Sequence, residues 1–183
     1  MVFTGVAAAA GLITGLLGGG SLRRLGDKRF LLWPLLPLGV VLQLPLLDAL
    51  GFGGLLASYA CLVVFSLANV RFVGMGLVTI GIAANVVPIA VNRGMPVDRD
   101  AVVSAGIAPV GRLPRLHLDR KHHLQRGDDT VMVLADIIPV RAAGEVISFG
   151  DVVLSVGVAD VLYHLMRPRL RHAVRDDGGA PET

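Results

Sequence analysis

Two aspartates beside the last hydrophobic segment are the residues of this chain best placed to do chemistry. Asp136 precedes that segment and Asp151 enters it, and both have apolar neighbours. A carboxylate beside lipid is costly, so the fold must give each one a partner or a task. Two carboxylates that share one proton can activate a water molecule for hydrolysis, because like charges at contact distance cannot both ionise. If each is paired or capped instead, both are structural.

Asp151 has a simpler structural interpretation, and both acids have a place in a binding pocket. Ser148 and Asp151 fit the Ser-x-x-acid pattern of a helix N-cap, where the helix dipole also favours an acid. Asp136 could pair with Arg93 in a salt bridge. Polar residues near the same end of the predicted helices would line an outward-facing pocket. The candidate pocket residues beside the two acids are Asn85, Asn92, Arg93, Gly94, Met95, Pro96 and His122.

The histidines suggest a metal site and a proton relay, and in both cases we favour a structural role instead. The segment His117-Leu-Asp-Arg-Lys-His-His123 holds three histidines and an acid. On a helix this spacing supplies two metal ligands at most, where a zinc site needs three or four. We therefore expect no metal and no cofactor, and a basic helix near lipid headgroups. Asp160 and His164, at i and i+4, could form a proton relay, but a mutual hydrogen bond is the more ordinary role.

The composition is typical of a multi-pass membrane protein. The chain is 54% hydrophobic and 17% charged, against about 25% charged in ordinary soluble domains. Its net charge of +3 comes mostly from arginines near the ends of hydrophobic segments, where they act as topology signals rather than as a nucleic-acid surface. The lone Cys61 excludes an intrachain disulfide and is expected to pack as a small apolar residue.

Hydropathy predicts an all-α protein, an integral membrane bundle of five transmembrane helices with a helical extracytoplasmic cap. Pro34, Pro37 and Pro45 fall in the second span, where we expect kinks in one helix. The spans form a single membrane domain over 1–175, followed by a disordered tail at 176–183. They cover about 2–18, 30–47, 55–70, 72–91 and 147–166.

Basic residues set the predicted orientation. They follow the first span and the last one, so the N-terminus is expected outside and the C-terminus in the cytoplasm of a bacterial cell membrane. The basic segment 167–175 is expected to bind anionic lipid headgroups.

The long polar loop at residues 92–146 becomes the outer cap in this topology. Asp98 and Asp100 could cap a short helix, and the apolar stretch 130–140 is expected to form a short interfacial helix, because it is too short to span.

Five motifs resemble those of a family of small bacterial integral membrane proteins classed only as a domain of unknown function. They occur in the expected order and extend over nearly the whole chain. The resemblance implies the five-span architecture and points to the outer motifs as shared features. The motifs are Gly18-Gly-Gly-Ser-Leu-Arg-Arg-Leu25, Asn92-Arg-Gly-Met-Pro-Val97, Lys121-His122, Ala135-Asp-Ile-Ile-Pro139 and Ser148-Phe-Gly-Asp-Val-Val-Leu154.

A weaker resemblance is to lipoprotein signal peptidase, a membrane aspartic peptidase. It implies catalysis by Asp136 in an outer loop and by Asp151 entering the last span. The chain departs from that family at Phe149-Gly150, where the family has Asn-Ala, and at Pro88-Ile89, where it has Asp-Arg. That family also has four spans rather than five.

Three functions follow from these observations. The first is a non-catalytic membrane component that binds a lipid or a partner membrane protein through the outward-facing polar pocket. The second is a membrane aspartic hydrolase, which requires Asp136 and Asp151 to lie within hydrogen-bonding distance. The third is a small transporter subunit, which would need an oligomer to form a path across the bilayer.

Overall fold

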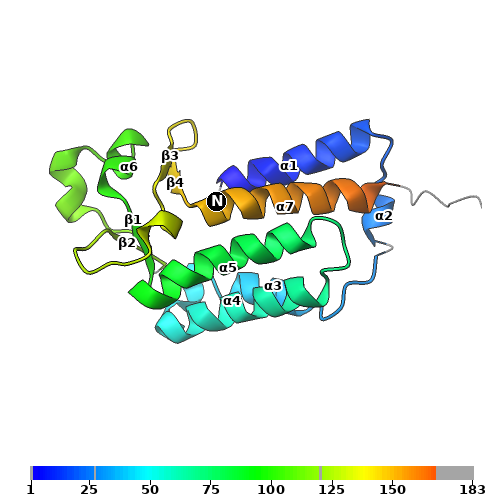
Figure 1. Cartoon of the computed structure of the whole chain (residues 1–183), viewed down its shortest axis with the longest axis horizontal. Helices are drawn as coiled ribbons and strands as arrows, with labels where there is room; N and C mark the ends of the chain where they lie inside the picture. The colour runs from blue at the N-terminus through cyan, green and yellow to red at the C-terminus, as the bar shows by residue number, and fades with distance from the viewer. Residues whose placement is uncertain (1, 27, 120, 168–183) are drawn as a thin grey trace, which may run out of the picture.

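The protein is mostly helical, with a bundle of helices lying side by side and a smaller cap at one end (Figure 1). The computed structural model describes residues 2–26, 28–119 and 121–167. The predicted tail, and the basic segment beyond Arg167, lie outside the described residues. The long helices are α1 (Val2–Leu17), α4 (Gly51–Ala68), α5 (Met75–Asn92) and α7 (Phe149–Met166).

Three of these helices, α4, α5 and α7, are long and apolar enough to cross a membrane, and α1 is a shorter apolar helix. Helices α1, α4 and α7 begin at the cap end, whereas α5 ends there (Figure 1). The amide of Phe3, in the first turn of α1, donates to the Glu145 carboxylate of the cap at 3.1 Å. The start of α1 and the cap therefore lie at the same end of the bundle.

Glycines bring α5 and α7 into backbone contact. A Cβ atom added at Gly81 would lie 2.5 Å from the backbone nitrogen of Leu154. One added at Gly157 would lie 2.6 Å from the backbone nitrogen of Val78. Small residues of this kind let helices approach closely where apolar solvent supplies no hydrophobic drive.

The expected continuous helix over 30–47 is wrong. The segment forms only the seven-residue helix α3 (Leu35–Val41), and a 3-10 helix, η1 (Pro45–Leu50), follows. Proline has no amide proton and clashes with the preceding turn. Pro34 and Pro37 are tolerated at the start of α3, where helix amides lack partners anyway. Pro45 falls beyond the end of α3, and the chain turns before it.

Side chains of α4 and of the turn after it satisfy the backbone of this broken segment. The Asn69 carbonyl accepts from the Leu31 amide at 2.8 Å, and its amide donates to the Leu31 carbonyl at 2.8 Å. Ser58 donates to the Gly39 carbonyl, also at 2.8 Å. Asn69 therefore joins the end of α4 to the chain before α3.

The cap is a mixed structure, so the all-α prediction is wrong for this region. Strand β1 (Met95–Val97) pairs in parallel with β2 (His122–Leu124), and β3 (Ile138–Val140) pairs antiparallel with β4 (Glu145–Ile147). A parallel bridge joins Val97 to Asp136. The expected basic helix around His122 is thus a strand, because backbone pairing across the loop overrides local preference.

Two further cap predictions had opposite outcomes. Asp98 caps helix α6 (Arg99–Ser104) by accepting from the Ala101 amide at 2.7 Å, as predicted. The apolar stretch 130–140 does not form the expected helix. It holds a 3-10 turn, η3 (Met132–Leu134), and then β3. Val131 stands at φ +57° before that turn, outside right-handed helical geometry.

The described residues also form the short helix α2 (Arg23–Gly26) and the 3-10 helix η2 (Val110–Arg115). The cap has a small apolar core of its own, which holds α6 and η2 against β1. Its buried members are Val97, Val102, Ala108 and Leu113.

Candidate functional site

Asp136 lies buried where the cap meets the helices, with 3% of its surface exposed. Its backbone is fixed on both sides: its amide donates to the Pro96 carbonyl at 3.1 Å, and its carbonyl accepts from the Asp98 amide at 2.9 Å. The Asn92–Val97 motif and the Ala135–Pro139 motif therefore meet in space. Sequence order alone, with about forty residues between them, could not predict this pairing.

The side chain of His122 links Asp136 to the surface of the cap. Its Nδ1 atom lies 2.5 Å from Oδ1 of Asp119, and its Nε2 atom lies 3.4 Å from Oδ2 of Asp136. The Asp119 side chain is 62% exposed, and that of Asp136 is 5% exposed. An imidazole donates hydrogen bonds from both ring nitrogens only when it is protonated. His122 can therefore donate to Asp119 and Asp136 at the same time only in its charged form.

The two carboxyl groups beside His122 have opposite pKa shifts. Burial raises the pKa of Asp136 from 3.8 to about 7, His122 and Lys121 oppose that rise, and the nearby Asp151 carboxylate adds to it. The hydrogen bond from His122 lowers the pKa of Asp119 from 3.8 to about 2. Asp136 also has one oxygen, Oδ1, with no hydrogen-bond partner among the described residues. A buried acceptor in that state is costly unless it is protonated or binds a ligand.

A second chain of hydrogen bonds ties the cap to α4. Lys121 Nζ donates to Oε1 of Gln43 at 3.0 Å, and Gln43 Nε2 donates to Oγ of Ser58 at 2.8 Å. Lys121 precedes the residue that contacts Asp136, so the Lys121-His122 motif serves both networks. Gln43 therefore bonds both to the cap and to α4.

Asp151 has a structural environment. It completes a capping box: its amide donates to Oγ of Ser148 at 2.9 Å, and its Oδ2 accepts from the Ser148 amide at 3.1 Å. Its Oδ1 accepts from Nδ2 of Asn85 at 2.7 Å, while Ser148 Oγ donates to Oδ1 of Asn85 at 2.8 Å. Both carboxylate oxygens are thus engaged, which is the capping arrangement that the sequence favoured.

This arrangement bears on the two-aspartate hypothesis. Within the described residues, no hydrogen bond joins Asp136 to Asp151, and the influence of one on the other is electrostatic. Within the same described residues, Asp136 forms no ion pair with Arg93. Its ionic contact there is with His122. Within the described residues, the carboxyl groups of Asp136 and Asp151 therefore have no hydrogen bond through which they could share a proton.

The remaining predicted pocket residues direct the chain from α5 into the cap. Asn92 exchanges two hydrogen bonds with the backbone of Thr130, at 2.9 and 2.8 Å. Arg93 ends α5 at φ +56°, and Gly94, at φ +150°, donates its amide to the carbonyl of Ile89. Met95 and Pro96 are buried in β1. Of the predicted set, only His122 contacts Asp136 through its side chain.

The cap holds a pocket of about 410 Å³ beside His122. Three imidazoles and one guanidinium contribute to its wall. His123 contacts Asp129 at 3.0 Å, a pairing that sequence reasoning missed; in the turn after β2, Asp129 also accepts from the Arg126 amide at 2.7 Å. No group of three or more metal-ligating side chains occurs in the described ranges. The polar lining residues are Arg99, His117, His122 and His123.

Comparison with known proteins supports the resemblance drawn from the sequence motifs. No curated protein and no solved structure matches the chain. The model of one family, described as a family of unknown function, DUF5317, matches residues 37–163. Four of the five motifs lie inside these residues, and Gly18–Leu25 lies before them. The resemblance to lipoprotein signal peptidase stays a prediction. Because the match covers most of the chain, the protein belongs to the family of unknown function DUF5317.

Proposed function

We propose that this protein is an integral protein of a bacterial cell membrane that binds a lipid or a partner membrane protein, without catalysis, through the polar pocket at its outer cap. The observation that carries the proposal is the buried Asp136, which has one unpartnered oxygen among the described residues and reaches the cap pocket through His122. Polar groups kept unsatisfied in a fold commonly mark a site whose partner is absent.

The membrane placement is supported by three long apolar helices and by the wide exposure of apolar side chains on the bundle. Exposed apolar patches of this extent suit contact with lipid rather than water. Helices α1 and α3, with η1, would complete five spans. Irregular backbone is tolerated at membrane depth only where protein satisfies it, and Asn69 and Ser58 do so for the broken second span.

The orientation follows from the same arrangement. The start of α1 lies beside the cap, and the arginines after α1 and at the end of α7 lie at the opposite end (Figure 1). By the positive-inside rule that opposite end is cytoplasmic, so the cap and the N-terminus face outward.

The binding step is proposed to use His122 as the link between ligand and buried acid. His122 lines the pocket and contacts Asp136, so a polar group bound in the pocket changes the charge that the imidazole presents to Asp136. The apolar part of the lining, Leu113, Leu116 and Leu124 among it, would contact the apolar part of a lipid or of a partner helix.

The proposal is tested by isolating the protein from its native membrane in polymer-bounded bilayer discs. Native mass spectrometry then identifies bound lipids, and protein cross-linking identifies partners. We expect a lipid or a membrane protein that accompanies the wild type and is lost from His122→Ala and Asp136→Asn. His164→Gln, at the opposite end of α7, is the matched control and should retain it. Identical co-isolated material from all four proteins would contradict the proposal.

A further inference from the structure

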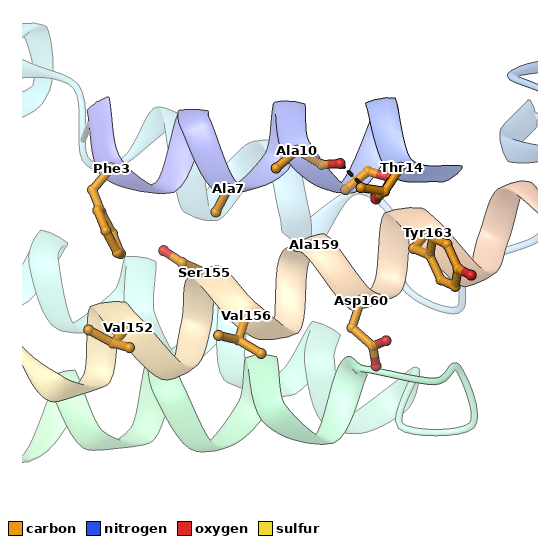
Figure 2. Close-up of a pocket in the computed structure, with 11 residues that line it drawn as sticks. Phe3, Ala7, Ala10, Thr14, Val152, Ser155, Val156, Ala159, Asp160 and Tyr163 are labelled. Carbon is orange, nitrogen blue, oxygen red and sulfur yellow. Dashed lines mark hydrogen bonds between the residues drawn. The ribbon is translucent and has the colours of Figure 1, made fainter. Parts of the chain in front are cut away.

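Helices α1 and α7 touch closely and leave an apolar groove beside their contact. A Cβ atom added at Gly11 would lie 2.5 Å from the carbonyl oxygen of Ala159, so the two backbones meet there. The adjoining groove has a volume of about 480 Å³ and is walled by both helices (Figure 2). Most of its wall is apolar, and the residues that form that part are Phe3, Ala7, Ala10, Val152, Val156 and Ala159.

The groove changes character toward the end away from the cap. Asp160 and Tyr163 line it there, with Tyr163 beyond Asp160 on α7 (Figure 2). The Arg167 guanidinium stacks over the Tyr163 ring, with its central carbon 4.7 Å from the ring centre. A terminal nitrogen of Arg167 also lies 3.0 Å from where a Cβ of Gly18 would be. Arg167 therefore occupies the place where both helices end, directly beyond the groove.

The acidic and basic side chains at this end of the groove differ in their partners. Oδ1 of Asp160 lies 2.9 Å from Nδ1 of His164, so the acid in the groove has a partner on its own helix. Arg24 donates from Nη1 to the carbonyl of Met166 at 3.2 Å, which brings a second guanidinium to the end of α7. No carboxylate contacts either guanidinium in the described part of the chain. Because these two arginines have no acidic partner among the described residues, this end of the groove can serve as an anion-binding surface.

We propose that the groove binds one anionic glycerophospholipid, with an acyl chain along α1 and α7 and the phosphate at Arg167 and Arg24. The proposal rests on the membrane placement of α1 and α7 proposed above. An apolar trough that ends in arginines has the charge and polarity pattern of a lipid chain that ends in a phosphate. Arginine binds phosphate through two parallel hydrogen bonds, and stacking on Tyr163 already orients its planar group.

Asp160 marks the end of the apolar part of the groove. Its side chain is 33% exposed although it lies within a proposed span. A carboxylate there is costly in hydrocarbon, and contact with His164 reduces that cost only in part. Asp160 precedes Arg167 by two turns of α7, or about 10 Å, so it lies at the level where a bound lipid would change from acyl chain to hydrated headgroup.

The test uses the full chain, purified in mild detergent after reconstitution with equal amounts of phosphatidylglycerol, phosphatidylethanolamine and phosphatidylcholine. Native mass spectrometry counts the lipids that stay bound. We expect the wild type to retain one phosphatidylglycerol in preference to the other two lipids. Arg167→Gln removes the phosphate contact and Ala10→Leu fills the groove, so each should reduce that retention by about tenfold.

Matched controls separate this site from general lipid adhesion. Arg71→Gln removes another arginine that stacks on an aromatic ring, that of Phe72, away from the groove. Ala9→Leu enlarges an exposed residue of α1 that does not line the groove. Both should retain the lipid like the wild type. Equal retention in all five proteins, or equal retention of the zwitterionic lipids, would overturn the proposal.

The experiment distinguishes failure of the groove proposal from failure of the cap proposal. The membrane fraction is assayed before purification, and a chain found outside it would remove the basis of both proposals. Membrane-bound protein whose groove variants bind lipid normally would overturn the groove site alone. The cap variant Asp136→Asn, at the other end of the bundle, should retain the groove lipid.

Discussion

The Nε2 atom of His122 lies 3.4 Å from Oδ2 of Asp136, and this contact connects a buried acid to an exposed face of the cap. Asp136 has a pKa of about 7, because burial disfavours its charged form more than His122 favours it. The proton on Asp136 is therefore gained and lost close to neutral pH, where an unperturbed aspartate is fully ionised.

The first prediction concerns stability against pH. The folded-state pKa of Asp136 is raised, so the stability it contributes is fully present below pH 3.8 and is lost as pH rises to about 7. The loss amounts to about 4 kcal/mol at most, at 1.36 kcal/mol for each pKa unit. Asp136→Asn should abolish this fall and exceed the wild type in thermal stability at pH 8. Unfolding in detergent between pH 4 and pH 8 measures it.

Asp128→Asn is the control for this prediction, because Asp128 is an exposed aspartate of the same cap. It should leave the pH profile unchanged. A wild-type profile that stays flat from pH 4 to pH 8 would show that Asp136 ionises normally.

The second prediction concerns His122. The imidazolium favours the ionised form of Asp136, so His122→Ala should raise the pKa of that carboxyl further. The fall in stability should then move to higher pH than in the wild type. His117→Ala removes another pocket histidine, whose Nδ1 lies 3.0 Å from the Arg115 carbonyl instead, and should not move it. A shift in the acid direction with His122→Ala would contradict the assignment.

The third prediction concerns the capping box at the start of α7. Ser148→Ala removes the cap and leaves the buried Asn85 carbonyl without its donor. Losing an N-cap costs about 1 kcal/mol and an orphaned buried acceptor about 1–3 kcal/mol more. Ser66→Ala is also a buried substitution, but that hydroxyl bonds a carbonyl of its own helix, and the cost should be smaller. Denaturant unfolding in mixed micelles compares them, and equal costs would contradict the prediction.

The fourth prediction concerns the contact between α5 and α7. Gly81→Ala and Gly157→Ala each place a methyl group within 2.6 Å of a backbone nitrogen of the facing helix. Overpacking of this kind costs about 1–3 kcal/mol. Gly76→Ala lies on α5 with no atom within 4 Å of the added group, and should be neutral or slightly stabilising. A Gly76 variant as destabilised as the other two would contradict the packing explanation.

The fifth prediction concerns the proposed orientation. In a Cys61→Ser background, cysteine is placed at His117 in the cap or at Arg29 near the other end of the bundle, and both positions are exposed. A membrane-impermeant maleimide should label the first in intact cells and the second only after lysis. The reverse pattern would overturn the proposed topology while leaving the fold intact.

Sequence reasoning located the features that depend on neighbours in the chain. The long helices followed from apolar runs of suitable length. The Ser148–Asp151 box and the Asp98 cap followed from residues three positions apart, because a cap bond joins such residues directly. The Asp160–His164 contact, at i and i+4, followed in the same way.

What could not be predicted depends on contacts between distant segments. Asp136 was singled out, but its contact with His122 requires β1 to lie between the two segments, and three-residue strands have no periodic signal. The broken second span was taken for one helix because prolines are tolerated in a bundle. Whether they kink or end a helix depends on partners such as Asn69, which the local sequence does not reveal.

The hydrogen bonds of Asp151 couple the opening of the first turn of α7 to α5. The same carboxylate closes the first turn of α7 and accepts from Asn85 of α5, so this turn cannot fray without releasing its neighbour. Helix ends usually exchange their amide protons quickly. Here the outermost amides of α7 should exchange as slowly as the interior of α5, and the two should open together as one cooperative unit.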